Sequence, residues 1–248
     1  MRPLRALVVL LALTWMTTPD ASAMECAQVE FEGLQYDQCT VDLAKDELRL
    51  WLDDADGAKL LSLGKVAAAA EATGNTLAFA MNAGMYHEDR DPVGHLMIDG
   101  KEHRGVMTRA GPGNFGMLPN GVFCWDAGKG YVVESRAYAK SPPECRHATQ
   151  SGPMLVIEGK LHPRFLPDST SFRLRNGVGV AEDGRTATFV ISRFPVTFHS
   201  FARYFRDQLK TPNALYLDGS ISRMYAPAIG RKDRGGRFGP IVGVVTRN

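Results

Sequence analysis

The chain has 248 residues, of which 44% are hydrophobic and 23% charged, with a formal net charge of +2. This composition is ordinary for a globular protein that forms one large domain or two small ones. A nearly neutral charge gives no electrostatic reason to expect a nucleic-acid partner, and we predict none.

Residues 1–23 are typical of a secretory signal peptide. Arg2 and Arg5 give a basic start, residues 6–15 are apolar, and Ala21-Ser22-Ala23 offers a small-residue cleavage site. An uncleaved membrane anchor is the alternative, but the apolar stretch is short for a bilayer span. We therefore predict a periplasmic or secreted domain over 24–248, without stable membrane insertion after cleavage.

Four cysteines remain in that domain: Cys26, Cys39, Cys124 and Cys145. An even number in an exported protein predicts disulfides, and the absence of a C-x-x-C spacing argues against a zinc or redox site. Three pairings are possible. We favour Cys26–Cys39 and Cys124–Cys145, since each joins neighbouring segments.

The hydrophobic pattern predicts the elements in the following order. Residues 36–52 form two strands around a turn at Lys45-Asp46, residues 57–73 form a helix that Gly74-Asn75 stop, and residues 76–81 form a buried strand. Strands broken by Gly, Pro and Asn follow as far as Val180. The last elements are a strand over 186–194, a helix over 198–210 capped by Thr197, an apolar run over 214–217 and a strand in 239–245.

Strands dominate this pattern, and only two helices are long. The sequence therefore predicts one α+β domain, in which the two main helices pack on a mixed or largely antiparallel sheet.

Polar residues and glycines gather at the ends of several apolar strands. The four junctions are Asn82-Ala83-Gly84, Gln150-Ser151-Gly152-Pro153, Arg173 and Arg175 before Asn176-Gly177, and Asp218-Gly219-Ser220. Glycine beside such residues lets a backbone approach a ligand closely. Four junctions of this kind predict a shared pocket.

Asp218-Gly219 has two interpretations. Asp-Gly between apolar stretches is a strong hairpin signal. Asp218 also begins where the buried run ends, which favours a carboxylate at the mouth of a site. We predict that it serves both purposes.

The ordered motifs of the chain resemble those of the phosphodiester glycosidase family, the family of the lysosomal uncovering enzyme. They are "FAMNAGMYHEDRDPVGHLMIDGKE", "GNFGMLPNGVF", "QSGPMLVIEGKLHP", "RLRNGVGV", "FPVTFHSFARYFRDQL" and "NALYLDGSISRMY". The resemblance runs from about Tyr36 to the last strand, and within the family it is nearest to a bacterial branch long described only as a domain of unknown function.

Individual residues follow from this resemblance. Asn82 and Gly84 match an Asn-Gly-Gly segment, here with Ala83 in the middle, and Gly152-Pro153 match a Gly-Pro-x-Leu segment. Residues 175–179 resemble an Arg-Thr-Ala-Ile-Gly segment, with Asn176-Gly177 in place of Thr-Ala and Val178 in place of Ile. Leu217-Asp218-Gly219 match the start of Leu-Asp-Gly-Gly-Gly-Ser. Here residues 220–222 read Ser-Ile-Ser, so the loop is bulkier than in the family.

The resemblance implies a hydrolase that cleaves a sugar 1-phosphodiester between the anomeric carbon and oxygen, without a cofactor. The expected partner is a phosphodiester-linked glycan or a small sugar phosphodiester. Arg175, with backbone amides of Gly84 and Gly219, would hold the phosphate, and Asp218 would stabilise the sugar cation, attack it or activate water. Asn82 completes the predicted catalytic set. The other predicted substrate-binding residues are Tyr86, Ser151, Gly152, Asn176, Ser220 and Ser222.

Two other functions compete with this one. His87, Glu88, Asp89, Asp91 and His95 suggest a metal-dependent phosphodiesterase, although their spacing matches no metal signature and we predict no metal. Glu88, Asp89 or Asp91 could also supply a second carboxylate, or lie on a solvated loop. The third possibility is a periplasmic glycan-binding module without activity.

One basic stretch stands apart from these motifs. Residues 231–240 read "RKDRGGRFGP" and carry four of the chain's cations within seven positions. The stretch is interpreted either as a solvated loop, which its glycines favour, or as a lip that binds an anion.

Overall fold

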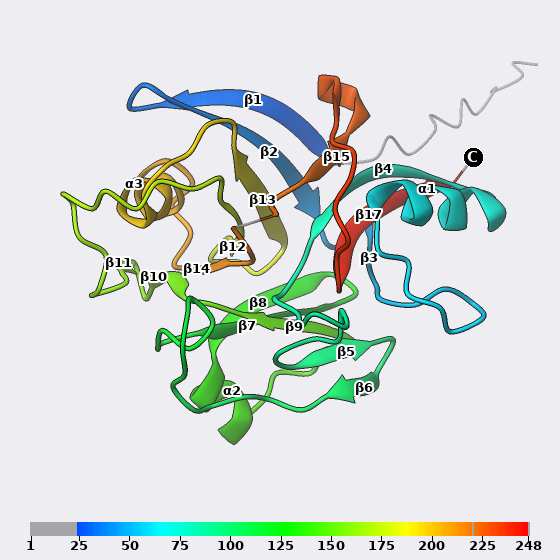
Figure 1. Cartoon of the computed structure of the whole chain (residues 1–248), viewed down its shortest axis with the longest axis horizontal. Helices are drawn as coiled ribbons and strands as arrows, with labels where there is room; N and C mark the ends of the chain where they lie inside the picture. The colour runs from blue at the N-terminus through cyan, green and yellow to red at the C-terminus, as the bar shows by residue number, and fades with distance from the viewer. Residues whose placement is uncertain (1–23, 220, 248) are drawn as a thin grey trace, which may run out of the picture.

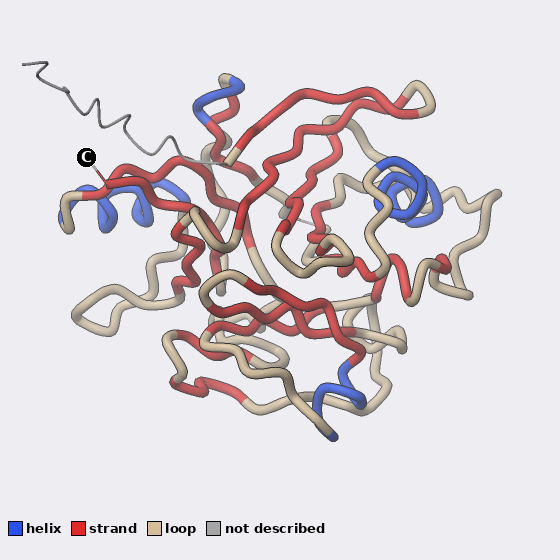
Figure 2. Tube along the Cα trace, turned by 180° about the vertical axis from the view of Figure 1, so that it is seen from behind, coloured by secondary structure: helices blue, strands red, loops and turns tan. Residues whose placement is uncertain are grey.

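The structure, a computed structural model, describes residues 24–219 and 221–247. The predicted signal peptide, Ser220 and Asn248 lie outside the described residues. Three antiparallel sheets make up most of the fold, with few helices (Figures 1 and 2). No helix in the described part of the chain is long and apolar enough to cross a membrane.

The first sheet has seven strands. They include the strand that follows Arg175 and the strand that precedes Asp218. In spatial order the strands are β1 (Glu25–Phe31), β2 (Leu34–Asp42), β13 (Thr186–Ser192), β12 (Asn176–Val180), β14 (Asn213–Tyr216), β10 (Met154–Ile157) and β11 (Lys160–Leu161). β12 is the central strand, so its five residues are all buried.

The second sheet carries the strand that ends at Asn82. Its order is β16 (Arg231–Lys232), β15 (Met224–Ala226), β4 (Asn75–Asn82), β17 (Ile241–Arg247) and β3 (Glu47–Trp51). The third sheet lies at the bottom of Figure 1, in the order β6 (Lys101–Arg104), β5 (Leu96–Ile98), β9 (His147–Ser151), β7 (Gly121–Asp126) and β8 (Lys129–Glu134).

The main core lies where the three sheets meet. Val178, Phe189 and Leu215 come from the first sheet, Phe79 from the second and Phe123 from the third, and all five side chains are fully buried in one cluster. A core that draws on every sheet fixes the sheets relative to one another, because each buries its apolar face against the others.

The helices cover different sheets. α1 (Leu63–Ala72) packs Val66 and Ala70 against β4 and β17, at the right of Figure 1. α3 (Phe198–Arg203) continues into a π-helical turn, η1 (Tyr204–Gln208), and packs on the first sheet. The remaining short elements are α2 (Ser135–Lys140) and the 3-10 turn η2 (Pro227–Ile229).

The segments predicted as strands do form strands. The prediction of largely antiparallel pairing is also confirmed, because the strand pairs of the described residues are antiparallel. The expected single sheet is instead three sheets. The strands predicted in 36–52 do form, but they pair with β13 and β17 in different sheets. Alternation along a strand identifies its buried face and leaves its partner open.

Both helices are shorter than the pattern suggested. The first begins at Leu63 and not at 57, because Ser62 caps it by accepting from the Lys65 amide at 3.2 Å. The second starts at Phe198 after the Thr197 cap, as expected, but its α-helical part ends at Arg203. The apolar stripe continues through the π-helical turn, so periodicity alone could not separate the two conformations.

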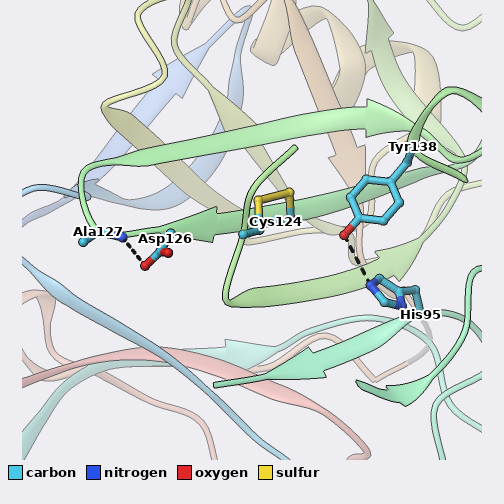
Figure 3. Close-up of a disulfide and its surroundings, with 6 residues drawn as sticks. His95, Cys124, Asp126, Ala127 and Tyr138 are labelled. Carbon is cyan, nitrogen blue, oxygen red and sulfur yellow. Dashed lines mark hydrogen bonds between the residues drawn. A yellow bond between two sulfur atoms is a disulfide. The ribbon is translucent and has the colours of Figure 1, made fainter. Parts of the chain in front are cut away.

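Both favoured disulfides are present. Cys26 and Cys39 are paired residues on β1 and β2, and Cys124 of β7 is joined to Cys145, just before β9. Figure 3 shows the second bridge on the third sheet, with Tyr138 reaching the His95 ring nearby. Each bridge links segments that the sheets already place side by side.

Candidate active site

Three of the predicted residues meet where strands of two sheets end. Asn82 is the last residue of β4, Asn176 is the first of β12, and Asp218 follows β14 after one residue. Asn82 and Asn176 are fully buried, and Asp218 is half-buried. The junctions that lie far apart in the sequence are therefore brought together at one place.

The Asn176 side chain joins these strand ends. Its Nδ2 donates to the backbone carbonyl of Asn82 at 3.0 Å, and its Oδ1 accepts from the Asp218 amide at 2.9 Å. Asn82 Oδ1 in turn accepts from the Arg223 amide at 3.0 Å. An asparagine offers both a donor and an acceptor, so it can bond two strands at once.

The chain bends at Gly219, but β14 and β15 on either side lie in different sheets, so Asp218-Gly219 is not the turn of a β-hairpin. The Gly219 amide donates to Asp218 Oδ1 at 2.6 Å, and Ser222 Oγ donates to the Asp218 carbonyl at 2.6 Å. The negative charge of Asp218 also raises the pKa of Tyr86 and of Tyr216, in addition to the larger effect of burial. The carboxylate thus acts electrostatically on two phenols that sequence analysis had not linked to it.

Arg175 is a buried cation with a defined orientation. Its side chain is 1% exposed, and it donates from Nε to the Val196 carbonyl and from Nη2 to the Ser171 carbonyl, both at 2.9 Å. The guanidinium carbon lies 3.6 Å from the ring centroid of Phe198. Within the described residues no carboxylate forms an ion pair with it, and Nη1 has no hydrogen-bond partner. Burial lowers the pKa of Arg175, partly offset by nearby Tyr216.

Tyr216 lies between Arg175 and the Asp218 turn. An added Cβ at Gly219 would stand 1.7 Å from the Tyr216 hydroxyl, so only glycine fits there. The guanidinium carbon of Arg175 is 5.7 Å from the Tyr216 ring centroid. The hydroxyl interacts electrostatically with Arg175, but without a hydrogen bond of ordinary geometry.

Several buried polar atoms of the candidate site have no hydrogen-bond partner among the described residues. Buried side-chain atoms without a hydrogen bond include Asn82 Nδ2, Tyr86 Oη, Arg175 Nη1 and Tyr216 Oη. Each can donate, and buried donors are rarely left unsatisfied unless a ligand or water completes them. This arrangement is suited to a ligand rich in acceptor oxygens.

Other predicted residues hold the strands in place. A Cβ on Gly84 would lie 2.3 Å from the Gln150 carbonyl oxygen, and the Gly84 amide donates to Thr149 Oγ1 at 3.1 Å. Ser151 Oγ donates to the Leu217 carbonyl at 2.5 Å, and Gly152 packs against Asn120. The amides of Gly84 and Gly219 both have partners within the protein. Ser220 lies outside the described residues.

The acidic loop after Asn82 is mainly exposed. Glu88, Asp89 and Asp91 all lie on the surface, and Asp91 pairs with Lys59 at 2.7 Å, which lowers the pKa of Asp91. In the part of the chain that the structure describes, no group of three or more His, Cys, Asp or Glu side chains is arranged to hold a metal ion.

Neither Tyr216 nor Phe198 belongs to the set of site residues predicted from the sequence. Tyr216 lies two residues before Asp218, and alternation places both side chains on one face of the strand. That spacing was the available signal for Tyr216. No signal in the sequence shows that Phe198 stacks on Arg175, because the contact joins a helix to a distant strand.

Comparison with known proteins identifies the family of the chain. The family model described as phosphodiester glycosidase matches residues 75–241, which include Asn82, Arg175 and Asp218. The chain therefore belongs to the phosphodiester glycosidase family. It is 33% identical over 217 residues to the uncharacterized protein YigE of Escherichia coli (strain K12), covering 88% of this chain and 84% of that protein.

Solved structures share the fold. The auto-inhibited catalytic domain of zebrafish N-acetylglucosamine-1-phosphodiester alpha-N-acetylglucosaminidase matches with a TM-score of 0.62 at 12% identity, over 94% of this chain and 85% of that one. A hypothetical protein from Synechocystis matches with a TM-score of 0.59 at 14% identity, over 90% and 62% of the two chains. At these identities the likeness concerns the fold.

Proposed function

We propose that the chain is an exported hydrolase, periplasmic or secreted, which cleaves a sugar 1-phosphodiester between the anomeric carbon and its oxygen. Membership of the phosphodiester glycosidase family supports this reaction class. One observation carries the proposal for this chain: a buried arginine, which pairs with no carboxylate among the described residues, lies near Tyr216, and Tyr216 also interacts with Asp218.

The positive half of the site is assigned to the phosphate. Arg175 is held by two backbone carbonyls and by Phe198, which leaves Nη1 as its available donor. A buried cation is costly unless an anion accompanies it. Phosphate oxygens would accept from Arg175 Nη1, with Tyr216 and Asn82 Nδ2 as further donors.

The leaving group suits this arrangement. A phosphate monoester has a second pKa near 6, so it departs as an anion near neutral pH without a strong general acid. What the departing group needs is fixed positive charge and hydrogen-bond donors where its own charge develops. The site supplies these from side chains that are already oriented.

The negative half of the site is assigned to the sugar. Asp218 is half-buried, and Asn176 and Gly219 fix its backbone and one carboxylate oxygen. A carboxylate so placed can stabilise an oxocarbenium-like carbon, attack it or activate water. Substrate-binding roles for Tyr86, Ser151, Gly152 and Ser222 remain predictions, as do those for Gly84, Gly219 and Ser220.

Hydrolysis in heavy-oxygen water tests which bond breaks. Cleavage at the anomeric carbon puts the label on the released sugar, whereas a metal-dependent phosphodiesterase puts it on phosphate. Label on phosphate would favour the metal-dependent alternative. Binding of a sugar phosphodiester without any turnover would favour a glycan-binding module.

A further inference from the structure

A polar cavity lies between the β1–β2 strands of the first sheet and the segment of residues 229–233, which includes β16 of the second sheet. Its volume is about 340 Å³, and its lining includes Gln28, Asp37, Arg193, Lys232 and Asp233. Part of its lining comes from the basic stretch after residue 230, which has no role in the proposed chemistry at Asp218.

The inner wall of this cavity is a buried carboxylate. Asp37 is 2% exposed, and its Oδ2 accepts from Arg231 Nη1 at 2.6 Å. Among the described residues its Oδ1 accepts no hydrogen bond, and its nearest cationic partner is Arg193, whose Nε forms an ion pair with it at 3.9 Å. A buried carboxylate oxygen without a donor is rare in folded proteins, so the cavity calls for a ligand that brings a hydroxyl or another donor.

The outer wall offers positive charge. Arg231 is shared between Asp37 and Asp233, so its charge is already balanced. Lys232 is exposed and makes no ion pair with any described residue, while Arg193 pairs with Asp37 Oδ1 at 3.9 Å and donates from Nη1 to Gln28 Oε1 at 3.2 Å. Cationic donors of this kind bind phosphate oxygens.

The cavity lies level with Asn176 along the first sheet, whereas Tyr216 of the candidate active site projects from the opposite face, toward α3. Asp37 pairs with Ile191, and Ile191 pairs with Asn176, so these three side chains project from one face. The backbones of Asp37 and Asn176 are two strand spacings apart, which is about 10 Å. The Asp233 carboxylate also accepts from the Met224 amide at 3.0 Å, next to Arg223, whose amide bonds Asn82.

We propose that this cavity binds a second phosphate-bearing sugar unit of the substrate. Asp37 Oδ1 accepts from a sugar hydroxyl, and Lys232 and Arg193 contact the phosphate. This inference rests on the proposed function, and it makes the substrate a glycan with repeated phosphodiester links rather than a single small phosphodiester.

Kinetics on two substrates test the inference. One substrate is an aryl phosphodiester of a single sugar, and the other is a synthetic two-unit sugar phosphodiester. For the double variant Arg193→Ala/Lys232→Ala, KM for the two-unit substrate should rise about tenfold, from the loss of charged contacts, with kcat retained. KM for the aryl substrate should stay unchanged.

Arg237→Ala is the matched control, since this exposed arginine lies on the same stretch but does not line the cavity. It should leave both KM values unchanged. Asp37→Asn should repeat the selective KM effect, and thermal unfolding will show whether the loss of the Arg231 pair weakens the fold. An equal change on both substrates, or no change on either, would overturn the inference.

Direct binding separates this inference from the proposed function. Glucose 1-phosphate is titrated into the Asp218→Asn protein and into the same protein with Arg193→Ala and Lys232→Ala added. It should bind more weakly to the second protein, and methyl glucoside should not compete with it. If the wild-type protein hydrolyses neither substrate, the proposed function fails, and this titration alone decides the inference. Equal glucose 1-phosphate binding with and without the two cations would then overturn it.

Discussion

Asn176 holds the Asp218 amide at 2.9 Å through its side-chain oxygen, while the other end of the same amide group bonds the last carbonyl of β4. One buried side chain thus sets the position of the candidate catalytic carboxylate relative to a different sheet. A change at Asn176 should therefore affect both stability and activity.

Replacement of Asn176 by Ala leaves a buried carbonyl and a buried amide without partners, which should lower the free energy of unfolding by about 2 kcal/mol. Activity of the still-folded protein should fall further than this loss explains, because the Asp218 turn loses its anchor. Denaturant unfolding and steady-state turnover measure the two effects. Asn213→Ala, which removes the bond to the Glu158 amide, is the control and should spare activity. Full activity in Asn176→Ala would contradict the positioning role.

Arg175→Ala should lower turnover by about a hundredfold, on the order of 3 kcal/mol, by analogy with the loss of one oxyanion donor. Arg175→Lys should restore only part of the rate, since a lysine cannot keep both carbonyl contacts and a third donor. Arg173→Ala, at the exposed neighbouring position, controls for general charge effects. The assignment of Arg175 to phosphate would not survive near-wild-type turnover in Arg175→Ala.

Asp218→Asn separates the turn from the chemistry. Asn serves the same turn and can accept from the Gly219 amide, so the variant should fold with little loss of stability. It lacks the negative charge, so activity should fall severely. Circular dichroism and turnover of the purified variant make the comparison. An active Asp218→Asn enzyme would return Asp218 to a purely structural role.

Acid should weaken the segment that supports Arg175. The His162 ring stacks on Phe165, Phe165 stacks on Phe198, and Phe198 lies beneath the Arg175 guanidinium. Burial lowers the pKa of His162 below its usual value of 6.5. The unfolded chain therefore binds the proton more readily, so this stability is present above about pH 6.5 and is lost as the pH falls.

Urea unfolding from pH 7.5 to pH 5 should show this decline, and His162→Gln should flatten it. Burial also lowers the pKa of His147, so His147→Gln should flatten the remaining slope. His103→Gln, at an exposed position, should leave the slope as it is. An unchanged slope in His162→Gln would show that its protonation is not coupled to folding.

Both disulfides should form on export. Thiol titration of the denatured, unreduced 24–248 protein should find no free thiols. Removing the Cys124–Cys145 bridge, which closes a loop of 21 residues, should cost about 3 kcal/mol by the loop-entropy estimate. Two or more free thiols in the exported protein would contradict the pairing.

The sequence by itself determined much of the local structure. The Thr197 cap, the β4 strand and the final strand follow from short-range patterns, because capping and alternation depend on neighbours within a few residues. The ordered motifs indicated the family, and the even number of cysteines in an exported chain predicted disulfides, with the observed pairing as the favoured one. Glycine at 84 and 219 predicted close backbone approach, and the structure shows where it occurs.

The tertiary structure decided which strands pair and which polar groups meet. Adjacent strands such as β2 and β3 enter different sheets, since partner choice depends on burial across the whole chain. From the sequence, the assignment of Arg175 to the phosphate rests on the resemblance to the family. Only the fold places Arg175 under the surface against Phe198, without a carboxylate, and next to Tyr216. Such contacts join residues that are distant in the chain, so no local pattern encodes them.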